Sequence, residues 1–67
     1  MRFNVGDICF FKEGLFVRVI DVDPEDSCLR VKVQYHLKFL GLMEHWVDER
    51  SLLTLQEWEF LKSLKGL

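Results

Sequence analysis

The sequence predicts one mainly-β domain, in which five short strands curl into a small barrel and a short C-terminal helix closes it off. Apolar and polar residues alternate strictly over residues 28–39, and tight-turn signals recur along residues 3–53. Residues 54–65 carry an apolar helical face behind a capping signal. Short strands and tight turns in so small a chain favour a closed barrel. An open sheet with the helix packed on one face is the alternative.

The composition indicates a compact domain that spans residues 1–67. A chain of 67 residues buries only roughly 60% of the surface that its unfolded form exposes. Hydrophobic residues make up 49% and aromatic residues 13%, which suffices for one core and argues against disorder. The net charge of −2 argues against non-specific nucleic-acid binding, because proteins of that class are usually basic.

The expected strands lie between turns rich in Gly, Asp and Pro. They cover residues 8–11, 15–22, 28–39, 43–47 and 52–53. In the third and longest strand, the odd-numbered residues are apolar, and their side chains are expected to face the core. This parity comprises Leu29, Val31, Val33, Tyr35, Leu37 and Phe39.

The helix is expected to begin with a capping box formed by Thr54 and Glu57. It should cover one end or one edge of the sheet. Trp58 and Phe60 are two residues apart and cannot share one helical face. We expect one of them to pack on the barrel and the other to be exposed, as a candidate surface for a partner or for self-association.

No feature of the sequence indicates a cofactor, a metal site, a membrane span or catalysis. Cys9 and Cys28 form no C-x-x-C pair and are expected to be free and buried, as in an intracellular protein. No histidine has further ligands at a zinc spacing, and no apolar run reaches the length of a membrane span. A chain this short leaves little room for a water-excluded active site, so we expect no enzyme.

Four short motifs follow one another along residues 3–53. They are FNVGDICF at 3–10, FVRV at 16–19, KFLG at 38–41 and EHWVDERSL at 44–52. In this order they resemble the chromo-barrel and Tudor branch of the Royal superfamily, whose members are SH3-like barrels. The resemblance implies an SH3-like fold and binding of methylated lysine or arginine.

The resemblance also implies an aromatic cage at the barrel rim. The matching positions are Phe11, Phe16, Phe39 and Trp46. A methylated ammonium is attracted by ring faces, which is the physical basis of such a cage. Leu42 stands where chromo-barrels usually have Trp. The alternative is that the phenylalanines are core residues and that Trp46 packs under the helix.

A second candidate surface is the polar parity of the long strand. Its basic residues are Arg30, Lys32, His36 and Lys38. Such a row fits a phosphate or an acidic peptide. The alternative is an ordinary solvated strand face whose charges are balanced by acids elsewhere.

We therefore expect a non-catalytic protein-interaction module that binds a peptide at the barrel rim, in the sharpest form a peptide with methylated lysine. One alternative is nucleic-acid binding by the basic strand face. The other is a bacterial or viral adaptor that acts through a homodimer or a host protein. No membrane partner is expected.

Overall fold

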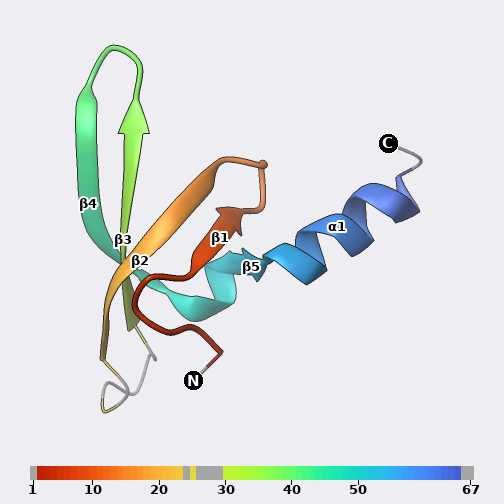
Figure 1. Cartoon of the computed structure of the whole chain (residues 1–67), viewed down its shortest axis with the longest axis horizontal. Coiled ribbons are helices and arrows are strands. Elements are labelled where there is room, and N and C mark those ends of the chain that lie inside the picture. The colour runs from red at the N-terminus through yellow and green to blue at the C-terminus, as the bar shows by residue number, and fades with distance from the viewer. Residues whose placement is uncertain (1, 24, 26–29, 66–67) are drawn as a thin grey trace.

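The structure is a computed structural model of the whole chain, and it describes residues 2–23, 25 and 30–65 (Figure 1). Within these residues, five antiparallel strands form one sheet and an α-helix follows the last strand. The elements are β1 (Ile8–Phe11), β2 (Phe16–Asp23), β3 (Arg30–Leu37), β4 (Gly41–Asp48), the 3₁₀ helix η1 (Glu49–Ser51), β5 (Leu52–Thr54) and α1 (Leu55–Leu64). The predicted mainly-β class, with five strands and a C-terminal helix, is confirmed.

The strand order is β4-β3-β2-β1-β5, which leaves β4 and β5 at the edges of the sheet. Among the described residues no ladder joins these two strands, so closure into a barrel is not confirmed. In the described residues β4 pairs with β3, and the three-residue strand β5 pairs with β1. The helix α1 follows the edge strand β5 and contacts β1 through Trp58 and Phe10, so it lies at this edge of the sheet. Figure 1 shows α1 running away from the sheet from the end of β5.

One face of the sheet, the core face, carries the buried residues. Those that the structure describes are Phe3, Cys9, Val17, Val19, Val31, Val33 and Leu52. Cross-strand pairs of equal parity place the polar residues of β2 and β3 on the opposite side, the outer face. The alternation over residues 28–39 thus assigned Val31 and Val33 correctly to the core. Residues 28 and 29 lie outside the described residues.

The long strand predicted to run to Phe39 ends earlier, at Leu37. Residues 38–40 form the turn of the β3–β4 hairpin, and Gly41 opens β4 with a φ of 81°, a conformation that favours glycine. Side chains in a turn no longer alternate across the sheet. Phe39, expected on the core parity, is therefore 90% exposed at the hairpin tip.

The predicted capping box is present at the start of α1. The Glu57 N–H donates to Thr54 Oγ1 at 3.1 Å, and the Thr54 N–H donates to Glu57 Oε1 at 2.8 Å. Arg2 Nη2 donates to the same carboxylate oxygen at 3.1 Å. The hydrogen bond from the Thr54 backbone is the main cause that lowers the pKa of Glu57.

The helix is anchored to the sheet by Trp58. Its ring stacks on Phe10 with centroids 5.3 Å apart and planes 15° apart. Gly14, in the β1–β2 turn, has a φ of 103°, and a Cβ there would lie 3.0 Å from Trp58 Cη2. Glycine at this position therefore permits both the turn and the close approach of the indole.

Candidate functional site

The outer face of the sheet holds exposed apolar side chains from three strands. Phe16 of β2 is 65% exposed and Leu42 of β4 is 60% exposed, and Ile8 of β1 and Trp46 of β4 are also exposed. Cross-strand register puts them on one face, since Ile8 pairs with Arg18, Leu42 with His36 and Trp46 with Lys32. Exposed apolar side chains gathered on one face typically mark an interaction surface.

A pocket of about 230 Å³ lies among these side chains, and we call it the outer-face pocket. It is lined by Ile8, Leu15, Phe16, Val17, Arg18, Gln34, Tyr35, His36 and Leu42. Most of this lining is apolar, and Arg18, Gln34 and His36 add polar groups. Sites for drug-sized molecules usually measure roughly 300–1,000 Å³, so this pocket suits a single side chain better.

The structure does not bring the four predicted cage residues together. Phe11 pairs with Leu52 and lies on the core face, whereas Phe16 lines the outer-face pocket. Trp46 lies on the outer face of β4, and Phe39 stands at the hairpin tip. A cage requires rings around one common space. Here the alternation of side chains along the strands sends the rings to opposite faces.

A different aromatic group forms beside the core. Phe11 meets Tyr35 edge to face at 5.4 Å between centroids, and Tyr35 meets His45 in the same manner at 5.3 Å. The rings of Phe11 and His45 lie 6.5 Å apart and nearly parallel, and the Tyr35 hydroxyl lies 3.4 Å from His45 Nε2. These distances are those of ring contact, so the rings occupy the space that a bound cation needs.

Sequence reasoning did not single out Tyr35 or Gln34 as site residues. Tyr35 stands between Val33 and Leu37 in the row predicted to face the core, and its aromatic ring is the one signal that distinguishes it from these aliphatic neighbours. For His45 the sequence shows only that no further ligands stand at a zinc spacing. Its contact with Phe11 depends on β4 and β1 facing the same side of the curved sheet, which no local pattern shows.

The predicted basic row is only partly continuous. Arg30, Lys32 and His36 lie on the outer face of β3, as the alternation indicates. Lys38 lies in the hairpin turn, where its Nζ is 5.5 Å from the centroid of the Phe39 ring. The structure thus keeps three of the four basic residues on one face.

Acidic residues flank this basic row on both neighbouring strands. Arg30 pairs with Asp23 of β2 and Asp48 of β4, and Lys32 pairs with Asp21 of β2. Opposite charges at directly facing positions attract one another and lower the net field. The outer face of β3 is therefore a mixed-charge surface and not a basic one.

Asp48 is held in its ionised form by Arg50. The Arg50 backbone N–H donates to Oδ1 at 2.9 Å, Nε donates to the same oxygen at 3.1 Å, and Nη2 donates to Oδ2 at 2.8 Å. The side-chain hydrogen bonds are the largest cause that lowers the pKa of Asp48 from 3.8 to about 2. Asp48 thus stays negative beside Arg30 at neutral pH.

Within residues 2–23, 25 and 30–65, no three His, Cys, Asp or Glu side chains lie close enough together to bind a metal ion. The described part of the chain also has no helix with the length and apolar character needed to cross a membrane. Cys9 is a fully buried free thiol, and burial is the main cause that raises its pKa to about 11. Cys28 lies outside the described residues.

No protein-family model, no curated protein sequence and no solved structure matches this chain. What the chain binds is therefore inferred from its own residues. The outer-face pocket and the exposed apolar side chains around it are the strongest candidate site.

Proposed function

We propose that this protein is a non-catalytic protein-interaction module that binds an extended peptide on the outer face of its sheet. One apolar side chain of the peptide occupies the outer-face pocket. The observation that carries this proposal is the group of Ile8, Phe16 and Leu42, which line the pocket and are exposed. Full burial of such a side chain contributes about 1.5–3 kcal/mol, so covering this face supplies a driving force for binding.

The polar groups around the pocket suit a peptide main chain. Arg18 and His36 line the pocket, and Gln34 Nε2 donates to Glu44 Oε2 at 2.7 Å. The rim thus presents hydrogen-bond donors and an anionic acceptor side by side. A peptide backbone offers both C=O and N–H groups, which such a rim can pair.

The edge strand β4 offers a second mode of contact to the same peptide. It contributes Leu42 to the pocket, and its only ladder in the described residues is the one with β3. The other side of β4 therefore has main-chain groups that an added strand can pair. Addition of a peptide to a sheet edge, with side chains entering pockets, is a common mode of recognition.

Two other predicted functions have less support. Nucleic-acid binding by the basic row is disfavoured because Asp21, Asp23 and Asp48 flank it. Methyl-lysine binding is disfavoured because the predicted cage rings lie on different faces. The resemblance to chromo-barrel and Tudor domains stays a prediction, and the proposal does not depend on it.

An NMR amide-shift titration tests the proposal. Labelled protein is titrated with capped peptides that are identical except for a central Phe, trimethyl-lysine or Ala. We expect the Phe peptide to shift amides of β1, β2 and β4 around the pocket, and the Ala peptide to shift none. The variant Leu42→Asp should lose these shifts, while Val5→Asp, a change at an exposed apolar residue outside the pocket lining, should keep them.

Three outcomes would contradict the proposal. Shifts with the trimethyl-lysine peptide alone would establish a methyl-lysine reader instead. Shifts with a single-stranded oligonucleotide that disappear steeply with added salt would establish nucleic-acid binding. Equal responses of Leu42→Asp and Val5→Asp would show that the pocket is not the binding site.

A further inference from the structure

The edge strand β4 presents an acid between two apolar side chains on the outer face. Leu42 is 60% exposed and Trp46 is 41% exposed, and the exposed Glu44 lies between them. Met43 and His45, which alternate with these residues, are half-buried on the other side. Figure 1 shows β4 at the edge of the sheet away from α1. A strand added at this edge would therefore set its own outward side chains beside Leu42, Glu44 and Trp46.

The charge of Glu44 is not balanced by a salt bridge. Gln34, directly opposite on β3, donates from Nε2 to Glu44 Oε2 at 2.7 Å. This donor is neutral, and among the described residues Glu44 forms no salt bridge. Lys32 lies diagonal to Glu44 in the register, but Asp21 of β2 lies directly opposite Lys32. The Glu44 carboxylate can therefore pair with a cation on an added strand.

A second copy of this chain does not suit the same edge. In an antiparallel pair of β4 strands, the register that sets Leu42 against Trp46 also sets the two Glu44 side chains against each other. Like charges at directly opposed positions destabilise a strand pair. A charge on an edge strand is also a common means of preventing pairing between copies. The strand that adds here should therefore come from a different chain, with a residue other than an acid at this position.

We infer that the bound peptide carries a basic residue between two apolar residues, in the pattern apolar–any–basic–any–apolar. This inference rests on the proposed function and names Glu44 as its specificity-determining residue. The basic side chain pairs with Glu44, and its methylene stem lies between Leu42 and Trp46, as apolar stems of Lys and Arg do on other apolar surfaces. The apolar residue beside Leu42 lies nearest the outer-face pocket, because Leu42 lines that pocket. The pattern reads the same in both chain directions, so it holds for parallel and antiparallel addition.

A set of three peptides tests the charge preference. They share the symmetric sequence Phe-Thr-Xaa-Thr-Phe within identical capped flanks, and Xaa is Lys, Gln or Glu. NMR titration gives a dissociation constant for each. We expect the Lys peptide to bind about fivefold more tightly than the Glu peptide, because an attractive cross-strand pair replaces a repulsive one. Salt at about 1 M should reduce this preference, because it screens exposed charges.

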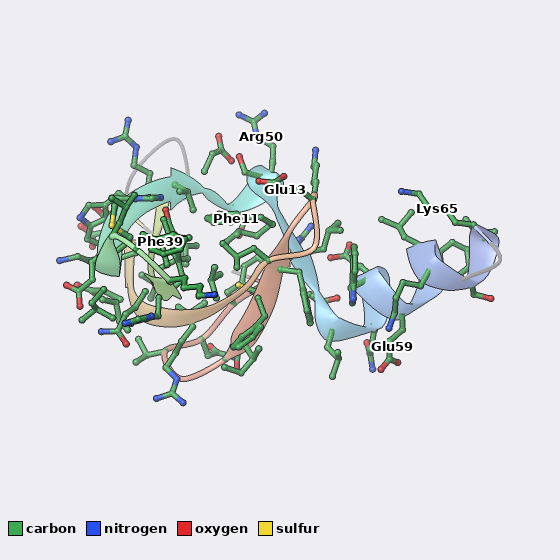
Figure 2. All side chains as sticks on the ribbon, turned by 90° about the horizontal axis from the view of Figure 1, so that it is seen from above. Phe11, Glu13, Phe39, Arg50, Glu59 and Lys65 are labelled. Atoms are coloured by element: carbon green, nitrogen blue, oxygen red, sulfur yellow. The ribbon has the colours of Figure 1, made fainter. Side chains whose placement is uncertain are left out.

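Variants of Glu44 assign the preference to this residue. Glu44→Lys should reverse it, so that the Glu peptide binds most tightly. Glu44→Gln keeps an oxygen that can accept from Gln34 and should bind all three peptides about equally. The matched control is Glu59→Lys, the same change of charge on an exposed residue of α1, far from β4 (Figure 2). It should keep the wild-type preference, and the amide spectrum of each variant checks its fold.

The possible failures separate this inference from the proposed function. Equal binding of the three peptides by the wild type would overturn the charge preference and leave the peptide site in place. A Lys preference that persists in Glu44→Gln would assign it to another acid. Tighter binding of all three peptides by Glu44→Gln would show that Glu44 only blocks the edge. Binding of none of the peptides by the wild type would overturn the proposed function, and this inference with it.

Discussion

At the scale of single residues, the face of the sheet on which a ring lies decides what that ring can bind. Phe11 and Phe16 are the same residue type on adjacent strands. Phe11 faces the core and contacts Tyr35, whereas Phe16 faces outward and lines a pocket. An odd offset in strand parity exchanges these roles. Binding chemistry in this protein is therefore set by parity as much as by residue type.

The pair of Asp48 and Arg50 gives a prediction at this scale. Arg50→Gln should raise the pKa of Asp48 from about 2 towards 3.8, because the side-chain hydrogen bonds are the largest cause of its depression. Arg30→Gln is the control and should shift it less, because Arg30 acts only as the weakest of the causes. Carbon-detected NMR titration of the carboxyl group measures both.

The same pair also affects stability against pH. The pKa of Asp48 is lower in the folded state than its ordinary value, so the ionised carboxylate stabilises the fold above pH 3.8. This contribution is lost as the pH falls through about 2. As the pH falls from 3.8 to about 2, the denaturant midpoint of Arg50→Gln should fall less steeply than that of the wild type. Identical slopes would contradict this assignment.

At the scale of elements, α1 depends on two local devices: a capping box at its start and an aromatic anchor one turn later. Thr54→Ala removes the hydroxyl that accepts the Glu57 N–H. We expect a loss of about 1 kcal/mol of unfolding free energy, as for other N-caps, while Thr54→Ser should retain most of it. Urea denaturation followed by circular dichroism measures the difference. An unaffected Thr54→Ala variant would mean that the anchor alone maintains the helix.

Substitutions at Gly14 and Gly6 test the packing of Trp58 against the β1–β2 turn. Gly14→Ala should lower the free energy of unfolding by about 1–2 kcal/mol because alanine disfavours a positive φ. It should lower it further because the added Cβ would lie 3.0 Å from Trp58 Cη2. Gly6→Ala is the matched control, since Gly6 has a φ of 97° and nothing within 4 Å of an added Cβ. Denaturation followed by tryptophan fluorescence gives the difference. Equal losses in the two variants would show that the indole does not pack on the turn as described.

At the scale of the whole molecule, the described residues form one curved sheet, and α1 extends from it to one side (Figure 2). The principal extents are 37 × 31 × 17 Å, and the sheet buries side chains on its core face alone. Stable domains usually pack two layers around a core. Here the part of the outer face around Phe16 and Leu42 is not covered by a second layer in the described residues. A peptide bound there, as proposed, would supply this cover.

Features set by near neighbours in the chain were predictable from the sequence. The strand positions, the core parity of Val31 and Val33 and the capping box of Thr54 and Glu57 all rest on spacings of two to three residues. Such patterns act through local backbone geometry, which the sequence displays directly. The separation of Trp58 from Phe60 is of the same kind, because helical geometry alone forbids a shared face.

Features that join distant segments were decided only by the tertiary structure. The register of three strands places acidic residues of β2 and β4 beside Arg30 and Lys32. In β2 this register shifts at an irregularity between Val19 and Asp21. The contact of Phe11 with His45 requires the curvature of the whole sheet. Whether the sheet closes depends on pairing between its two edge strands, β4 and β5, which lie far apart in the sequence. Non-local pairing sets these outcomes, and no window of adjacent residues contains them.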